Sequence, residues 1–218
     1  PQLLELSGIG NREILEQADI ECKHHLPGVG ENLQDHLTIN IQQGLQGVTT
    51  FFEETRPLAM TKNLFKYLFR RKGLLAHPAS QAGVFLRSSS EVERPDGQIH
   101  FAPAASEADK KGNLKTRPGT TATICHLRPE SRGSVHITSP RATDHPAIRA
   151  NYLDSEQDRQ AIVALVRKVR EIFQAPALDR YRAKEFRPGA AIQTDEEILE
   201  FVKAEAESVY HPVGTCKM

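Results

Sequence analysis

A histidine near one end of the sequence has the surroundings expected of a proton-transfer group. His211 lies in the run YHPVGTCKM at residues 210–218. Pro212 steers the backbone of the preceding residue toward an extended conformation, and Gly214 permits unusual dihedral angles or the close approach of a ligand. Imidazole is the side chain that most readily exchanges a proton near neutral pH. From these residues alone, His211 is either a structural loop residue or a catalytic acid–base group.

A second group of polar side chains lies in the glycine-rich run LPGVGENLQDH at residues 26–36. Asn32, Asp35 and His36 fall within five positions of one another. Such side chains often bond the backbone of their own loop, and they could equally lie along a polar cofactor. The sequence leaves both interpretations open.

Two G-x-G fragments begin at Gly8 and Gly28, and neither completes a dinucleotide-binding fingerprint. Glu13 and Leu33 stand where G-x-G-x-x-G requires its third glycine. We therefore interpret these glycines as turn residues.

Other reactive side chains lack the spacing that their chemistry requires. Cys22, His24 and His25 have no second pair of ligands, which argues against a zinc site. Cys125 and His126 are neighbours in a predicted strand, so their side chains are expected to face opposite ways. No serine stands in a nucleophile-elbow pattern, which argues against an α/β-hydrolase.

Composition limits the class of protein. The 218 residues suffice for one large domain or two small ones. Lys and Arg total 28, equal to Asp and Glu at 28, so the net charge gives no reason to expect nucleic acid or an anionic membrane as partner. No apolar run approaches the ~20 residues of a transmembrane helix. Three widely spaced cysteines favour a reducing compartment.

Helices and strands are expected in a definite order. Short helices are predicted at residues 2–6 and 11–17, with Asn11 as N-cap, and an extended segment at 37–43. A third helix should begin at residues 55–57, place Leu64, Phe65 and Leu68 on one face and stop at Gly73.

Strands are predicted beyond that point, at residues 83–86, 99–102, 120–127 and 134–138. The turn-forming run PESRG at 129–133 predicts that the last two form an antiparallel pair. Two helices follow, at 154–173 with one apolar stripe and after a capping box at 194–197. Clustered strands followed by helices predict an α+β fold, an antiparallel sheet covered by helices, with a boundary near residues 72–77.

These segments together resemble the glucose–methanol–choline (GMC) family of flavin-dependent oxidoreductases. Residues 1–10 are similar to the end of the family's second signature, and 26–37 to the segment that follows it. Residues 127–135 resemble the edge hairpin of its substrate domain, and 151–153 and 210–218 complete the set. The order and spacing hold across essentially the whole chain. The choline dehydrogenase and FAD-dependent alcohol dehydrogenase branch is the most similar.

The resemblance implies an FAD enzyme that oxidises an alcohol, choline-like or neutral and primary, to the aldehyde. His211 matches the family's catalytic histidine, which accepts the hydroxyl proton or stabilises the alkoxide while the flavin accepts a hydride. The residues expected along the flavin are Asn32, Asp35, His36, Val213, Gly214 and Thr215. For the substrate pocket we expect Gln81, Phe85 and Phe101. Relatives often carry Glu where Gln81 stands, so a neutral alcohol is favoured over choline.

The resemblance also predicts a division of the chain. It gives a partial FAD-domain segment at 1–40, a helical connector at 41–76, a substrate-binding domain at 77–209 and the start of a C-terminal flavin-site segment at 210–218. The family's G-x-G-x-x-G unit and its second catalytic residue fall outside these 218 residues, so we expect part of a larger enzyme. By themselves the 218 residues should bind FAD weakly or not at all, be inactive, and self-associate through the exposed FAD-domain interface.

The remaining expectations concern partners and location. The partners expected are a small alcohol and an electron acceptor of unknown identity, without nucleic acid or metal. The expected location is cytoplasmic, peripheral to a bacterial inner membrane. Two alternatives stay open: a non-catalytic module that binds a small ligand or a protein, and a structural fragment that self-associates.

Overall fold

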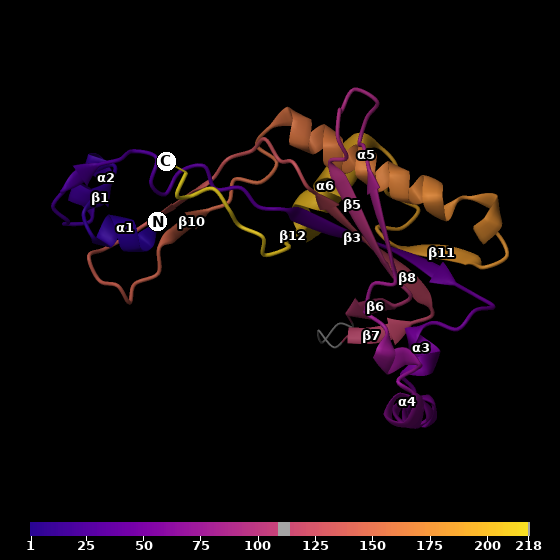
Figure 1. Cartoon of the computed structure of the whole chain (residues 1–218). Helices are drawn as coiled ribbons and strands as arrows, with labels where there is room; N and C mark the ends of the chain where they lie inside the picture. The colour runs from indigo at the N-terminus through magenta and orange to yellow at the C-terminus, as the bar shows by residue number, and fades with distance from the viewer. Residues whose placement is uncertain (109–113, 218) are drawn as a thin grey trace. The chain divides into compact units, whose positions relative to one another are not determined.

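The computed structural model describes residues 1–108 and 114–217 (Figure 1). These residues form two compact units. Unit 1 comprises Pro1–Leu37, Arg128–Gln160 and Ser208–Met218, and unit 2 comprises Thr38–Leu127 and Ala161–Glu207. Each unit therefore combines segments that are distant in the sequence. The predicted division into flavin-site and substrate-binding parts concerns function and stays a prediction.

Unit 1 is built from short elements. They are α1 (Gln2–Leu6), β1 (Ile9–Gly10), α2 (Arg12–Gln17), β2 (His24–His25), β9 (Ser134–His136) and β10 (Ala147–Arg149). Strands β1 and β2 are parallel, and β9 and β10 are antiparallel. Both predicted helices are confirmed, and Asn11 caps α2 by accepting the Glu13 N–H at 3.0 Å. Leu15, Ala18 and Ile137 form its small apolar core.

A buried acid ties α1 to β9 within unit 1. Glu5 is fully buried, and its carboxylate accepts the Ile137 N–H at 2.9 Å and faces His136 Nδ1 at 2.7 Å. The other ring nitrogen of His136 lies 3.1 Å from Glu31. One imidazole therefore bridges two carboxylates from different segments.

Unit 2 contains an antiparallel sheet with strand order β11-β3-β8-β5-β4. The strands are β3 (Leu37–Leu45), β4 (Ala82–Leu86), β5 (Gly97–Ala102), β8 (Gly119–His126) and β11 (Arg182–Arg187), and β12 (Glu207–Ser208) also pairs with β3. One face buries alternate residues, including Ile39, Ile41, Ile99, Ala122 and Ile124. The predicted α+β class with an antiparallel sheet is confirmed.

Two helices cover that apolar face: α5 (Glu156–Phe173), which belongs to unit 2 from Ala161 onward, and α6 (Asp195–Glu205) (Figure 1). Of the predicted stripe of α5, five residues are buried and Ile172 is partly buried; the buried ones are Ile162, Leu165, Val166, Val169 and Phe173. Leu165 packs so closely on Gly97 that a Cβ there would overlap the leucine side chain. Thr194 and Glu197 form the predicted capping box of α6.

The remaining elements of unit 2 are α3 (Phe51–Glu54), α4 (Pro57–Arg70), the 3₁₀ turns Leu74–Ala76 and Pro176–Leu178, and the hairpin β6 (Ala105–Ala108) and β7 (Leu114–Arg117). Helix α3 was not predicted, although Thr50 and Glu53 form a capping box for it. Helix α4 starts at the expected proline. It ends when Arg71 adopts a left-handed conformation, two residues before the predicted Gly73.

The predicted hairpin across residues 129–133 is wrong. Strand β8 pairs with β3 and β5, whereas β9 pairs with β10. Gly133 instead exchanges two backbone hydrogen bonds of 2.9 Å with Leu33. The buried Asp158 carboxylate accepts the N–H groups of Glu130 and Ser131 at 2.8 and 2.9 Å. Because these peptide groups bond elsewhere, the turn-like composition does not join two paired strands.

Candidate active site

Two loops of unit 1 lie side by side and carry the histidines singled out by the sequence. Gln34 and Val213 exchange backbone hydrogen bonds of 2.9 and 2.8 Å, and the Val209 N–H donates to the His36 carbonyl at 3.0 Å. The Gly30 N–H donates to the Thr215 carbonyl at 2.9 Å. Segments almost 180 residues apart in the sequence are thus joined by main-chain bonds.

Asp35 is the centre of this pairing. One carboxylate oxygen accepts the backbone N–H groups of His36 and His211, both at 2.9 Å. The other accepts the hydroxyls of Tyr152 and Ser208. Burial by itself raises the pKa of Asp35, but the four hydrogen bonds to its anionic form outweigh burial and hold the pKa below its usual value. The side chain is therefore an anion that fixes the backbone of both histidines.

The two imidazoles meet beside this carboxylate. Their Nδ1 atoms are 3.4 Å apart, and the rings stand edge to face at 74° with centroids 5.4 Å apart. A hydrogen bond between them requires one Nδ1 to carry a proton and the other to accept it. The His211 side chain is exposed and the His36 side chain is partly buried. This arrangement presents an accessible imidazole, backed by a second one, that can take up a proton.

Asn32 and Gly214 hold the loops together at their other end. Asn32 adopts a left-handed φ of 62°, and its amide donates to the Gly214 carbonyl at 3.3 Å and accepts from Arg132 Nε at 3.0 Å. Gly214 has a φ of 98°, and any Cβ there would overlap the Asn32 backbone. The loop therefore requires glycine at 214 for its own packing.

The six residues predicted to line a flavin are thus gathered in one place. Asn32, Asp35 and His36 lie against the segment carrying Val213, Gly214 and Thr215. The polar atoms of Asn32 and Asp35 bond other protein groups. Asp35 is buried, Asn32 and His36 are partly buried and Val213 is exposed, so among these four Val213 offers the most surface to a ligand.

Most glycines of the two G-x-G fragments lie in turns, as expected. Gly8 and Gly30 have φ values of 83° and 85°. A Cβ on Gly8 would lie 2.6 Å from the Glu21 carbonyl oxygen, and one on Gly30 would lie 2.5 Å from the His136 ring. Internal packing explains both glycines. The interpretation as turn residues is confirmed for Gly8, Gly28 and Gly30, but it is wrong for Gly10, which lies in β1.

The predicted substrate residues do not share one face of the sheet. Phe101 pairs with Ala82 and stacks edge to face on Phe173 of α5, so it belongs to the helix-covered face. Phe85 pairs with Gln98, one position out of phase, and is 62% exposed on the opposite, open face. Gln81, exposed at the start of β4, donates its N–H to the Phe101 carbonyl at 2.9 Å.

A polar row across the open face was missed by the sequence analysis. The strand register aligns Gly83, His100, Thr123 and Asn40. The Thr123 hydroxyl donates to the Asn40 side chain at 2.6 Å. Polar residues do alternate with apolar ones along these strands in the sequence. Which of them lie next to one another can be told only when the strand register is known.

The neighbouring row contains the thiol of Cys125, which pairs with Gln98 and Thr38. Burial raises the pKa of this thiol, partly offset by the hydrogen bond to the Thr38 hydroxyl. His126 is in register with Gly97, on the helix-covered face. The predicted opposition of Cys125 and His126 is confirmed.

The described part of the chain offers neither a metal cluster nor a membrane-spanning helix. No group of three His, Cys, Asp or Glu side chains there could hold a metal ion. No helix among those residues is long and apolar enough to cross a membrane.

Comparison with known proteins gives the class of this fold and site. Residues 129–218 match the family model described as GMC oxidoreductase, so this part of the chain resembles that family. Over all 218 residues it is 40% identical to the oxygen-dependent choline dehydrogenase of Pectobacterium atrosepticum, of which it covers 39%.

Solved structures share the fold. An FAD-dependent oxidoreductase from Chaetomium thermophilum matches 97% of this chain with a TM-score of 0.84 at 23% identity, over 43% of its own length. Pyridoxine 4-oxidase from Mesorbium loti matches 99% of the chain with a TM-score of 0.77 at 23% identity, over 38% of its length. The chain thus spans about two fifths of the length of the relatives it matches.

Proposed function

We propose that the complete protein is an FAD-dependent oxidoreductase that oxidises an alcohol to the aldehyde. The observation that carries this proposal is the accessible His211 imidazole, backed by His36 and held at its backbone by anionic Asp35. Relatives named as choline dehydrogenase and as FAD-dependent oxidoreductase support the same reaction class.

The residues of unit 1 fit the reactive end of a flavin and not its phosphates. Two main-chain segments packed through Gly214 leave the imidazole pair accessible. The G-x-G glycines are used in internal packing, so a phosphate cradle is not available from them. We propose that His36 and the Val213–Thr215 segment lie against FAD, with Asn32 shaping the loop. When bound, FAD supplies the two-electron acceptor for the alcohol.

In this proposal His211 accepts the hydroxyl proton of the substrate. Its Nδ1 faces His36, so Nε2 is the atom directed to the alcohol. Removing that proton raises the electron density on the oxygen. A hydride then leaves the adjacent carbon more easily. A positioned base of this kind typically contributes ~10²–10⁴-fold to the rate.

Asp35 acts in this proposal as a positioning residue. Both of its oxygens are bonded to protein donors, so it is poorly placed to bind a ligand directly. Its contacts to the N–H groups of His36 and His211 instead set where the two rings stand. This assigns to Asp35 a role different from the direct flavin contact expected from the family resemblance.

For substrate contact we propose the open face of the sheet, at Gln81 and Phe85. The phase of Phe101 directs it to the helices, so its contribution would be indirect. An uncharged Gln81 offers no carboxylate for a quaternary ammonium group, which favours a neutral primary alcohol over a choline-like one. Self-association of the 218 residues, their inactivity in isolation and a location beside a membrane are further parts of the proposal.

Replacing His211 tests the proposed function. In the complete protein, His211→Ala should lower the rate of flavin reduction by an alcohol roughly 10²–10⁴-fold while flavin content stays unchanged. Stopped-flow absorbance of the flavin measures the rate. The matched control is His77→Ala, at an exposed histidine of unit 2, which should react like the parent. Near-parental rates for His211→Ala would refute the assignment.

The alternative is a binding module without redox chemistry. Its distinguishing observation is a complete protein that carries no flavin absorbance after purification with added FAD. In that case the two loops would hold a different ligand, and no alcohol would produce a spectral change.

A further inference from the structure

The segment that contains helix α4 is strongly basic, although the whole chain is neutral. Between residues 56 and 72 it has six cationic residues and no Asp or Glu: Arg56, Lys62, Lys66, Arg70, Arg71 and Lys72. Because the totals over the whole chain are 28 and 28, the residues outside this segment carry an excess of acids. The zero net charge therefore hides one concentrated positive region.

The same helix exposes a row of large apolar side chains. The exposed fractions are 83% for Leu58, 56% for Phe65 and 79% for Phe69, and Leu64 and Leu68 are also exposed. Phe65 and Phe69 are one turn apart and stack with their rings nearly parallel, 6.1 Å between centroids. Single exposed apolar residues are common on proteins, but five on one helix are a contiguous surface that calls for a partner.

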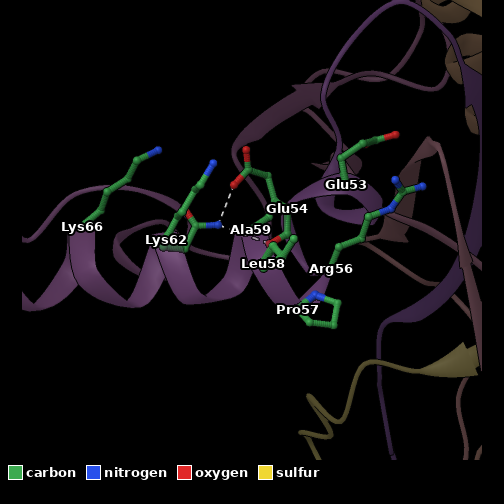
Figure 2. A pocket seen from close by; sticks show the side chains of 9 residues that line it. Glu53, Glu54, Arg56, Pro57, Leu58, Ala59, Lys62 and Lys66 are labelled. Atoms are coloured by element: carbon green, nitrogen blue, oxygen red, sulfur yellow. Dashed lines mark hydrogen bonds between the residues drawn. The ribbon is translucent and has the colours of Figure 1, made fainter.

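The opposite side of α4 is held by helix α3, and this contact fixes the direction in which the apolar row points. Asn63 is buried, and its amide donates to the Glu54 carboxylate at 2.6 Å and to the Glu54 carbonyl at 3.3 Å. Figure 2 shows this bond, with Lys62 and Lys66 projecting from the neighbouring turns of α4. The exposed row is therefore held outward by a buried polar contact.

The cations border the apolar row. Lys62, Lys66 and Arg70 line a shallow hollow together with Phe65 and Phe69. Their aliphatic stems extend the apolar area while their charged ends stay in water. An apolar strip beside a cationic strip on one helix is the pattern of helices that lie in the plane of a membrane surface.

We propose that α4 docks on the surface of an anionic lipid bilayer. Leu58, Phe65 and Phe69 enter the boundary between headgroups and acyl chains, and Lys62 and Lys66 contact lipid phosphates. Charge complementarity selects this partner, because an anionic bilayer satisfies both strips at once. The proposal rests on α4 alone and is independent of the proposed redox function.

Vesicle binding by the complete protein tests the proposal. Co-sedimentation should recover the protein with vesicles of equal parts phosphatidylglycerol and phosphatidylcholine, and much less with pure phosphatidylcholine. Binding should weaken at about 0.5 M NaCl, where surface charges are screened. The double variant Phe65→Ser, Phe69→Ser should bind roughly 10- to 100-fold more weakly. Lys62→Glu, Lys66→Glu should lose the preference for anionic vesicles.

Matched controls lie in unit 1. Ile148→Ser removes an apolar side chain that is 66% exposed, and Lys23→Glu reverses an exposed cation. Both should bind vesicles like the parent. Equal loss in these controls, or no parental binding to either vesicle, overturns the proposal.

Two other occupants of the face have their own outcomes. If the complete protein is a dimer that Phe65→Ser, Phe69→Ser dissociates, the face joins two copies and the lipid proposal fails. If Phe69→Cys resists thiol labelling without lipid, other parts of the protein cover α4 and the proposal also fails. Flavin reduction by an alcohol, measured on the same preparations, reports separately on the redox function.

Discussion

At the scale of single residues, Asp35 determines how the candidate site is held. Four donors from three segments converge on its carboxylate. Charge-assisted hydrogen bonds of this kind contribute more than neutral ones, and a buried donor left without its acceptor is destabilising. The positions of His36 and His211 therefore depend on a side chain that need not touch the substrate.

The lowered pKa of Asp35 gives a prediction for stability against pH. Because the folded state favours the carboxylate, its contribution is fully present above the unfolded pKa of about 3.9 and is lost as pH falls through the folded pKa. Asp35→Asn should lower the free energy of unfolding by about 2–3 kcal/mol at pH 7. The difference between parent and variant should shrink below about pH 4. Urea denaturation across pH 3–7 measures it, and a difference that stays constant with pH would contradict the assignment.

The sequence identified His211, Asp35 and His36 from local composition. It could not show that they meet, because His36 and His211 are separated by 175 positions. It also missed Tyr152 and Ser208 as partners of Asp35. Tyr152 lies in the run NYL at 151–153, where Asn151 and Leu153 adopt left-handed φ values of 55° and 60°. Such backbone conformations are not legible from residue type alone.

At the scale of elements, the packing of α5 on the sheet rests on Gly97. A side chain there would overlap Leu165, which is fully buried. Gly97→Ala should therefore lower the free energy of unfolding by about 1–3 kcal/mol, because the core has no room for an added methyl group.

A double-mutant cycle separates this cause from a general weakness of the strand. Leu165→Ala by itself should be destabilising because it leaves a cavity. In combination, the two substitutions should cost less than the sum of the separate effects, since each relieves the other. Strict additivity in urea unfolding would show that the overlap is not the cause.

Periodicity and caps predicted the long elements well. The stripe of α5 and the capping box of α6 are local patterns, and their consequences are local too. The hairpin at residues 129–133 failed for the opposite reason. Its peptide groups bond Asp158 and Leu33, which lie far from the turn in the sequence. The same composition serves a reverse turn and a loop tied down by a distant carboxylate.

At the scale of the whole molecule, the chain order does not follow the spatial units. The class of fold was predictable because an antiparallel sheet and amphipathic helices each leave a periodic pattern. The composition of the units was not, because each unit joins segments that are separated in the sequence by residues of the other unit. Contacts of that range carry no local signal.

Retention of flavin tests the proposal for the isolated 218 residues. With the G-x-G glycines committed to internal packing, this chain should release FAD on gel filtration, whereas the complete protein should keep it. The ratio of flavin to protein absorbance in the eluted fractions measures retention. Stoichiometric flavin on the 218 residues would contradict this expectation and would require a phosphate site of another kind.

The main-chain bonds between residues 34 and 213 have a consequence for the order of folding. Closing so long an intervening stretch is entropically unfavourable until the rest has condensed. The histidine pair should therefore be among the last features acquired on the folding pathway. The amides of these loops should therefore exchange their hydrogens faster than those of the central strands. Ageing or mild heating would then unfold the loops and displace the imidazole of His211 while most of the protein stays native.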